Sequence, residues 1–254
     1  MRILLTNDDG IEAPGMAALE AIAATLSDDV WVVAPAEEQS GTGHSLTLTA
    51  PIRLRKLGEK RFAVRGTPTD SVMMAVGQVM RDHRPDLLLS GVNRGGNLAE
   101  DVTYSGTVSA AMEGCLAGIR SIALSQQMAD YTQGRESFDA AAGLGADIVR
   151  RVIAVEWEPG VLININFPPL PAAGIKGVRV TEQGFRDYGH IAIDARTDPR
   201  GFDYYWFGYG REVDSPGHDT DLKAMHEGFV SVTPMHLDMT HRATMAGLRT
   251  ALGV

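Results

Sequence analysis

Cysteine, long apolar runs and positive charge are all scarce in this sequence of 254 residues. The single cysteine, Cys115, excludes a disulfide framework and a cysteine-rich zinc site. No apolar run approaches the roughly 20 residues that a transmembrane helix needs. Asp and Glu outnumber Lys and Arg by 32 to 23, so the formal net charge is -9. A negative field repels polyanions, which argues against binding to a nucleic-acid duplex or to an anionic membrane.

The N-terminus opens directly into a strand-like run and has no stretch typical of a signal peptide. We therefore expect a cytoplasmic protein. The length suits one large core with an appendage better than two independent domains. We expect an α/β core over residues 1–180, a β-hairpin extension over 181–235 and a closing C-terminal helix over 236–254.

Short apolar runs typical of buried strands alternate with segments of helical periodicity through the first two thirds of the chain. After the first run, which ends before Asp8, the strand-like segments are 30–35, 86–93, 121–125 and 161–168. This alternation predicts an α/β, Rossmann-like doubly wound fold with a mostly parallel sheet. An alternating pattern at 46–48, 52–55 and 62–64 predicts a half-exposed, hairpin-like insertion.

Aromatic residues make up only 6% of the chain, yet eight of the sixteen lie between Phe185 and Tyr209. Turn residues at 198–201 and alternation in the following segment predict a C-terminal antiparallel β-hairpin extension. Exposed aromatic residues favour a protein partner, so we expect this extension to join a homodimer or a homotetramer. The alternative is a lid or edge extension folded back on its own core.

Two adjacent acids, Asp8 and Asp9, directly follow the first strand-like run. A parallel strand delivers such residues to the carboxyl edge of the sheet, where open α/β folds bind ligands. Neighbouring carboxylates repel each other and titrate as a pair unless a cation or a proton lies between them. Hard oxygen ligands suit Mg²⁺, Mn²⁺ or Ca²⁺. The pair therefore predicts a metal site, with capping of a helix near Pro14 as the alternative.

Polar residues also follow two other strand-like runs. Ser40 lies in a small glycine-rich loop, where its hydroxyl group is a candidate for metal or phosphate contact, although loop serines commonly just face solvent. Asn93 ends a buried run and supplies a neutral oxygen, and the glycines at 95 and 96 allow close backbone approach to a ligand.

Ser105, Gly106 and Thr107 open a segment rich in small residues that reads as a long helix. The free N–H groups of a helix N-terminus, together with flanking hydroxyl groups, form a natural phosphate cradle. The alternative for these residues is ordinary helix capping, because Ser and Thr are frequent N-cap residues.

Taken together and in order, these motifs resemble the SurE survival-protein family. The motifs are Asn7-Asp8-Asp9-Gly10, Ser40-Gly41, Gly66-Thr67-Pro68, Ser90-Gly91-Val92-Asn93, Gly95-Gly96-Asn97 and Tyr104-Ser105-Gly106-Thr107-Val108. Each is weak alone, but the ordered set is specific and runs through about the first half of the chain. The resemblance implies metal ligands at Asp8, Asp9, Ser40 and Asn93. It implies phosphate contacts at Asn97, Ser105, Gly106 and Thr107.

The resemblance further implies a metal-dependent 5'-nucleotidase that hydrolyses nucleoside 5'-monophosphates, with activity on 3'-nucleotides and short polyphosphate in some members. One divalent ion, Mg²⁺, Mn²⁺ or Ca²⁺, is the expected cofactor. Our hypothesis for catalysis is that water attacks the phosphoryl group while Asp8 or Asp9 orients or deprotonates it. Asp8 as a covalent nucleophile is the alternative. His44 is a candidate donor of the proton to the leaving oxygen.

Other functional classes fit the sequence less well. A non-catalytic, Mg²⁺-dependent nucleotide- or phosphate-binding signalling module of the receiver type would need an Asp on the third strand and a Lys on the fifth, where Asn93 and Ser125 stand. An NAD(P)-binding oxidoreductase would carry Gly-x-Gly-x-x-Gly where this chain has two acids. An adhesion role would explain the aromatic hairpins and leave the polar motifs without a purpose.

Overall fold

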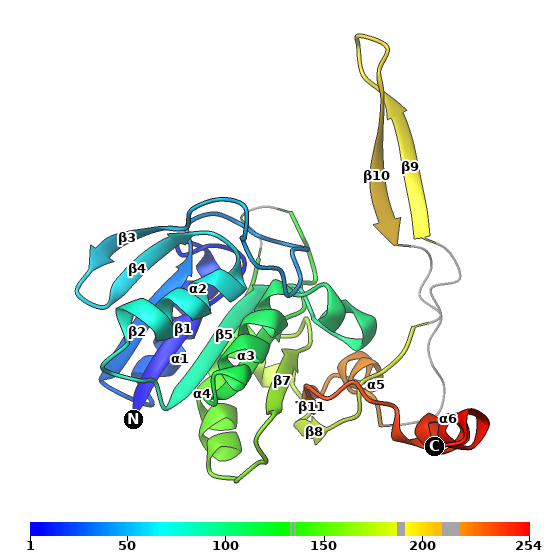
Figure 1. The fold of residues 1–254 in the computed structure, drawn as a ribbon. Helices are drawn as coiled ribbons and strands as arrows, with labels where there is room; N and C mark the ends of the chain where they lie inside the picture. The colour runs from blue at the N-terminus through cyan, green and yellow to red at the C-terminus, as the bar shows by residue number, and fades with distance from the viewer. Residues whose placement is uncertain (133, 135, 187–190, 210–218) are drawn as a thin grey trace.

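A nine-stranded sheet with helices on both faces forms the body of the protein, and a two-stranded arm projects from it (Figure 1). The computed structural model describes residues 1–132, 134, 136–186, 191–209 and 219–254. The strand order in the large sheet is β3-β4-β2-β1-β5-β6-β7-β11-β8, and β9 pairs with β10 in the arm. The five pairings among β4, β2, β1, β5, β6 and β7 are all parallel, which confirms the predicted fold class.

The bounds of the elements follow the predicted alternation closely. The strands are β1 Arg2–Thr6, β2 Asp29–Pro35, β3 Arg53–Gly58, β4 Arg61–Arg65, β5 Leu87–Arg94, β6 Arg120–Gln126, β7 Val161–Phe167, β8 Val178–Val180, β9 Ile191–Thr197, β10 Asp203–Tyr209 and β11 Val230–His236. The α-helices are α1 Pro14–Ala24, α2 Pro68–Met74, α3 Gly106–Leu116, α4 Asp139–Ile153, α5 Asp221–His226 and α6 Arg242–Leu252. Shorter helical turns are η1 Ala75–Val79, η2 Ala99–Thr103 and η3 Ala172–Gly174.

Two apolar clusters, one on each face, hold the sheet between its helices. Residues of α1 and α4, such as Met16 and Ile148, belong to one cluster. Residues of α2 and α3, such as Val72 and Val108, belong to the other. The central strands are apolar on both sides because both of their faces are covered. No helix in the described part of the chain is long and apolar enough to cross a membrane.

Only part of the expected hairpin-like insertion at residues 46–64 is a hairpin in the structure. Residues 46–48 are not a strand; Thr47 is instead bound to Asp70, which accepts from its amide nitrogen at 3.1 Å and from its hydroxyl at 2.6 Å. The hairpin consists of β3 and β4, and β4 joins the large sheet parallel to β2. Alternation alone could not reveal that a helix residue far along the chain fixes Thr47.

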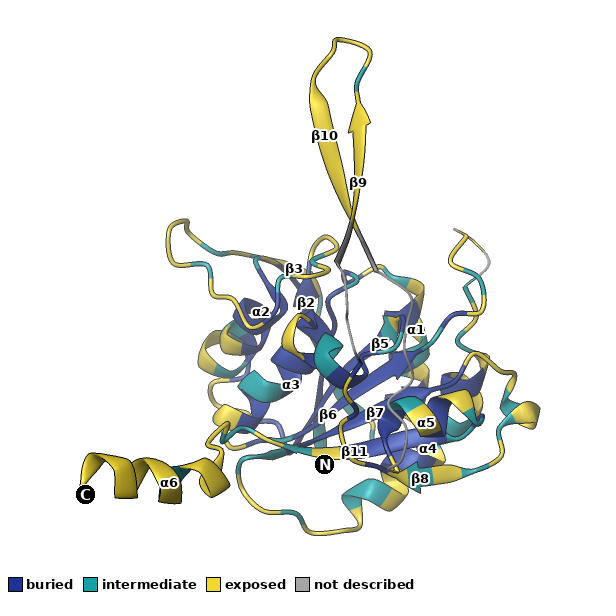
Figure 2. Ribbon diagram, turned by 90° about the vertical axis from the view of Figure 1, so that its right-hand side faces the viewer, coloured by how far each residue is buried: buried dark blue, intermediate teal, exposed yellow. Residues whose placement is uncertain are grey.

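The C-terminal part combines a return to the sheet with two exposed elements. After α5, strand β11 enters the large sheet between β7 and β8. The β9–β10 hairpin turns at residues 198–202 and pairs only with itself among the described strands. Figure 2 shows the hairpin and α6 as almost entirely exposed, and none of the residues of α6 is buried. The hairpin confirms the predicted antiparallel extension, whereas the proposed division of the chain at residues 180 and 235 stays a prediction.

Candidate active site

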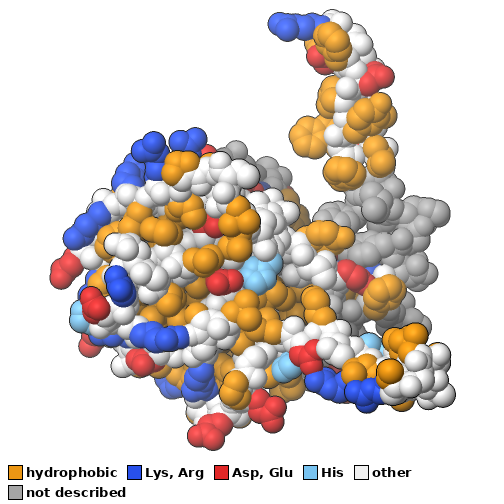
Figure 3. Space-filling view, viewed as in Figure 1, with side chains coloured by type: hydrophobic (Ala, Val, Ile, Leu, Met, Phe, Trp, Pro, Cys, Tyr) orange, Lys and Arg blue, Asp and Glu red, His pale blue; other side chains and the backbone are white. Residues whose placement is uncertain are grey.

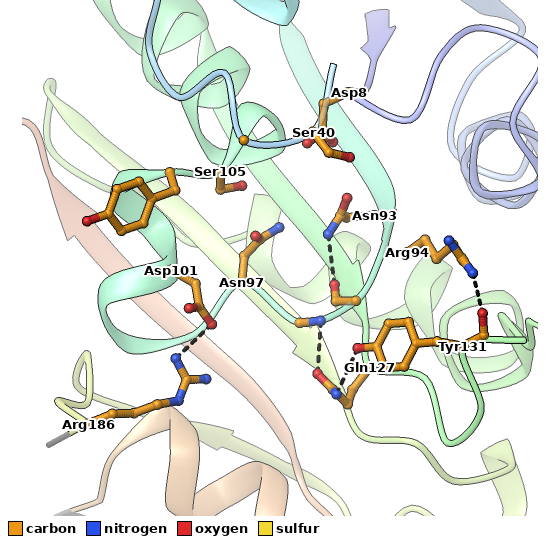
Figure 4. A pocket seen from close by; sticks show the side chains of 14 residues that line it. Asp8, Ser40, Asn93, Arg94, Asn97, Asp101, Ser105, Gln127, Tyr131 and Arg186 are labelled. Atoms are coloured by element: carbon orange, nitrogen blue, oxygen red, sulfur yellow. Dashed lines mark hydrogen bonds and ion pairs between the residues drawn. The ribbon is translucent and has the colours of Figure 1, made fainter. Parts of the chain in front are cut away.

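A pocket of about 370 Å³ opens at the carboxyl ends of β1, β2, β5 and β6. This is the edge at which open α/β sheets bind ligands. The volume lies in the range of about 300–1,000 Å³ typical of small-molecule sites. Figure 4 shows polar side chains converging on it from several segments. The lining residues are Asp8, Ser40, Gly41, Asn93, Arg94, Gly95, Gly96, Asn97, Asp101, Tyr104, Ser105, Gln127, Tyr131 and Arg186.

Asp8 is almost completely buried between β1 and the first turn of α3. One of its carboxylate oxygens accepts a hydrogen bond from the hydroxyl group of Thr107. A Cβ atom at Gly106 would lie 2.7 Å from the Cβ of Asp8, so only glycine lets α3 begin this close to the carboxylate. Burial raises the pKa of Asp8, and the hydrogen bonds from Thr107 oppose that rise.

Asp9 lies next to Asp8 and accepts a hydrogen bond from the backbone N–H of Arg94 at 3.1 Å. Burial, followed by repulsion from Asp8, raises the pKa of Asp9 from 3.8 to about 7. Neither acid caps the helix that follows, because the N-cap of α1 is Ala13 and no side chain caps it. Two adjacent carboxylates, one buried and one half-buried, that both have raised pKa values form a place where a cation is strongly favoured.

Ser40 and Asn93 add two neutral oxygens to this pair. The Ser40 hydroxyl donates to Glu38 at 2.8 Å, which leaves its lone pairs directed elsewhere. The Asn93 amide nitrogen donates to the Gly95 carbonyl at 2.9 Å, so its oxygen faces Asp8 and Ser40 (Figure 4). Carboxylate, amide and hydroxyl oxygens fit Mg²⁺, Mn²⁺ or Ca²⁺. Among the described residues no group of three or more His, Cys, Asp and Glu could hold a metal, so a thiolate- or imidazole-rich site has no support there.

The bend that presents Asn93 depends on one glycine. The register between β5 and β6 shifts between Ser90 and Asn93. Gly91 has a φ of 135° in this irregular stretch, and a Cβ there would lie 2.1 Å from the Leu124 carbonyl oxygen. A side chain at this position would push β5 away from β6 and displace Asn93 from the pocket.

The N-terminus of α3 borders the pocket through Ser105. This residue is the N-cap, and its hydroxyl oxygen accepts from the backbone N–H of Val108 at 3.0 Å. The hydroxyl proton therefore stays available for an acceptor in the pocket. The partial positive charge of the helix end favours an anion at the same place.

Asn97 is held by a buried network that the sequence reasoning missed. Its backbone N–H donates to Asn166 at 2.8 Å, and its carbonyl accepts from Asn164 at 2.8 Å and from Asn166 at 3.1 Å. Its side-chain nitrogen donates to Ser125 at 2.8 Å. Asn164 and Asn166 are fully buried in β7. Two asparagines two residues apart in an apolar strand share one face, and this pattern was a readable signal for a polar network.

Several other lining residues gave no signal in the sequence. Gln127 accepts from the Gly96 N–H at 3.0 Å and donates to the Tyr131 hydroxyl at 3.0 Å, which ties two walls of the pocket together. Arg94 lies 5.9 Å from the centre of the Tyr131 ring. Arg186 comes from far along the chain and donates to Asp101 at 2.7 Å.

The structure brings most of the predicted residues together. Asp8, Ser40, Asn93, Asn97 and Ser105 all line the pocket. Gly106 and Thr107 lie directly behind the lining because both pack on Asp8, and Asp9 follows Asp8 in the chain without being part of the lining. Their roles in metal or phosphate contact stay predictions.

His44 is not part of this cluster of side chains. It lies outside the pocket lining and pairs with Glu113 of α3 at 3.1 Å. The structure therefore gives no support to His44 as the donor of a proton to the leaving oxygen.

Comparison with known proteins settles the family of this chain. Residues 3–190 match the model of the family described as "Survival protein SurE". The chain belongs to the SurE family.

SurE relatives match over nearly the whole chain. It is 60% identical over 247 residues to a 5'-nucleotidase SurE of Rhizorhabdus wittichii and 58% identical over 246 residues to one of Erythrobacter litoralis, with 97% of each chain covered in both cases. A crystal structure of the SurE protein from Aquifex aeolicus is 40% identical, with a TM-score of 0.85 and 99% of both chains covered.

Proposed function

We propose that this SurE-family chain is a metal-dependent 5'-nucleotidase that hydrolyses nucleoside 5'-monophosphates to nucleosides and phosphate. The observation that carries the proposal is that buried Asp8, with Asp9 next to it in the chain, meets the N-cap of α3, Ser105, in one pocket. SurE relatives that are 53–60% identical carry the name 5'-nucleotidase. Activity on 3'-nucleotides and short polyphosphate is included in the proposal.

The chain itself supplies two kinds of groups to the reaction. Asp8, Asp9, Ser40 and Asn93 would hold one divalent ion, Mg²⁺, Mn²⁺ or Ca²⁺, and when bound it would neutralise the acids and polarise a phosphoryl oxygen. Ser105 and the α3 N-terminus bind the equatorial phosphate oxygens through N–H and O–H donors. Fixed donors at this position stabilise the charge that builds up during phosphoryl transfer.

Asp8 and Asp9 differ in what they can do with a proton. Asp8 is fixed by Thr107 and keeps one direction, which suits a ligand. Asp9 accepts only from a backbone N–H in the contacts described, and its raised pKa suits a group that orients water and takes its proton. Asp8 as a covalent nucleophile is the competing mechanism, and a phosphoenzyme trapped by acid quench and seen by mass spectrometry would replace ours.

Phosphate release from a panel of nucleoside 5'- and 3'-monophosphates tests the function. The protein is stripped with EDTA and then supplied with Mg²⁺, Mn²⁺ or Ca²⁺. We expect release only with metal, and fastest from 5'-monophosphates. Tight metal and nucleotide binding without any release would favour a non-catalytic binding module instead.

We also propose that the β9–β10 arm joins copies of the chain into a homodimer or a homotetramer. The side chains of Tyr205, Trp206 and Phe207 are 63%, 60% and 87% exposed on β10. Figure 3 shows apolar side chains gathered along the arm, away from the body. Apolar surface of this kind is stabilised when a partner covers it.

A further inference from the structure

The segment from Asn97 to Ser105 forms one wall of the pocket. One residue of this wall has an unfavourable backbone conformation. Ala99 has a φ of 50° and is the only non-glycine residue with a positive φ in the described part of the chain. It opens η2, which spans Ala99–Thr103 and lies between Asn97 and Ser105. A residue with a Cβ atom disfavours this left-handed region by about 1–2 kcal/mol, so something must hold Ala99 there.

Two side chains from the C-terminal part hold Ala99 from both sides. Asp221 accepts from the Ala99 N–H at 2.9 Å, and Gln183 donates to the Ala99 carbonyl oxygen at 2.9 Å. Asp221 is fully buried, and its other oxygen accepts from the N–H groups of Gly184 and Leu222 at 2.8 Å each. We refer to Gln183 and Asp221 as the Ala99 clamp.

The neighbours of Ala99 are held by the same part of the chain. The Arg186 guanidinium group donates to the Leu98 carbonyl at 3.3 Å and to the Asp101 carboxylate at 2.7 Å. The Arg186 N–H donates to Glu100 at 2.5 Å. Four consecutive residues of the wall, 98–101, are therefore fixed by segments that bracket the β9–β10 arm in sequence.

The position of this wall matters for the proposed phosphate site. Asn97 lies two residues before Ala99 and is fixed by the asparagines of β7, while Ser105 lies six residues after it and caps α3. A change of Ala99 to a right-handed conformation would redirect the chain between these two anchors. The residues that line the pocket in between, Asp101 and Tyr104, would move with it.

We propose that Gln183 and Asp221 are positioning residues that hold Ala99 in its left-handed conformation and thereby shape the phosphate side of the pocket. The proposal rests on the proposed function for its kinetic readout only. The two clamp residues flank the arm in sequence, Gln183 before β9 and Asp221 after β10. The clamp therefore connects the pocket wall to the chain segments on either side of the arm.

The double variant Gln183→Met, Asp221→Asn removes the clamp with little change in volume. An amide at position 221 keeps its oxygen toward the two donors, Gly184 and Leu222, and so loses the bond to Ala99. We expect faster hydrogen exchange at the Ala99 amide and about fivefold or greater loss of affinity for inorganic phosphate in the presence of Mn²⁺. KM for a nucleoside 5'-monophosphate rises by a similar factor, and kcat changes less because Asp8 and Asp9 lie outside the clamp.

Adding Ala99→Gly to the double variant distinguishes positioning from general damage. Glycine populates the left-handed region freely, so it should restore most of the phosphate affinity and KM although the clamp bonds are still absent. Ala99→Gly alone should keep the wild-type values. Glu227→Gln is the matched control, because it breaks the ion pair with Arg179 in the same C-terminal part without touching the wall.

Unchanged phosphate affinity and KM in a folded double variant would overturn the proposal, and so would a failure of Ala99→Gly to restore them. A wild-type protein without any phosphatase activity would overturn the proposed function instead. In that case amide exchange at Ala99 and phosphate binding would still decide whether the clamp positions the wall.

Discussion

The carboxyl edge of the large sheet and the β9–β10 arm are both unusual in the side chains that they bury or expose. The edge buries polar groups, whereas the arm exposes apolar ones. At the edge, carboxylates and amides are buried, with Asp8 only 4% exposed. On the arm, aromatic residues are in solvent, with Phe207 87% exposed. A buried charge and an exposed apolar surface each raise the free energy of the isolated chain.

The difference between the two regions indicates what each of them is for. The polar groups at the edge are fixed one by one, as Asp8 is by Thr107 and Asn97 by Asn166. Such an arrangement suits a small ligand that needs fixed geometry. Neither strand of the arm pairs with a described strand of the large sheet, so the arm suits a large partner that supplies a surface. Variants that change only one of the two regions test this difference, because activity should depend on the edge and assembly on the arm.

The largest effect is expected for Asp9→Asn. The substitution keeps the size of the side chain but removes the charge that would hold the cation and the group that would take a proton from water. We expect metal-dependent phosphate release to fall by at least about 100-fold, with the far-UV circular dichroism and the assembly state unchanged. Wild-type turnover in this variant would remove Asp9 from the site. Glu12→Gln serves as the matched control, because Glu12 is an exposed acid three positions away that pairs with Arg61 and lies outside the pocket lining.

The next effect is on assembly. Replacing Trp206 and Phe207 by serine removes aromatic surface from the arm, and we expect the dimer or tetramer to weaken by at least about tenfold in Kd. Sedimentation over a range of protein concentrations measures this change. Asp194→Asn on the facing strand is the control, because Asp194 pairs with Trp206 across the hairpin. The same mass for wild type and double variant at every concentration would assign the arm another role.

A smaller effect is expected on the stability of metal-free protein as the pH rises. The pKa of Asp9 is about 7 in the folded chain, and its usual value is 3.8. Between pH 3.8 and pH 7 the folded chain therefore keeps a proton on Asp9 that the unfolded chain has lost. The stability that this proton contributes is fully present below pH 3.8 and is lost as the pH rises through 7.

Between about pH 5.5 and about pH 8, metal-free wild type should lose about 2 kcal/mol relative to Asp9→Asn. This corresponds to a shift in Tm of roughly 4–8 °C for a chain of this size. Thermal unfolding in EDTA at both pH values measures it, and Mn²⁺ should reverse the loss in wild type only. Parallel Tm values for the two proteins at both pH values would contradict the raised pKa.

The features of the edge and of the arm that depend on short stretches of sequence were predictable. Strand ends placed Asp8, Ser40 and Asn93 at one edge because parallel strands bring their carboxyl ends together. Aromatic alternation predicted the arm. The prediction did not extend to Asp221, which the structure shows accepting a hydrogen bond from Ala99 across 122 positions.

Contacts of this kind depend on the path of the whole chain. The partners of Asn97 on β7 lie 67 and 69 positions away, and no local pattern sets that distance. The alternating asparagines of this apolar strand are a signal for a buried polar network that the prediction did not use, and they do not reveal which backbone the network holds. The sequence therefore predicted where the site lies, at the carboxyl edge of the sheet. It did not predict the long-range contacts that shape the walls of the pocket.

The smallest effect separates the two roles of Ser105 at the edge. Ser105→Ala removes both the cap of α3 and the hydroxyl group, so we expect about 1 kcal/mol of lost stability and a few-fold rise in KM. Ser105→Gly also removes the hydroxyl, but glycine is tolerated as an N-cap and should cost only a few tenths of a kcal/mol. If the hydroxyl contacts phosphate, both variants raise KM equally while only alanine lowers Tm. If KM instead follows Tm across the two variants, Ser105 acts through the helix, and phosphate binding at this end of the pocket depends on the N–H groups of α3 alone.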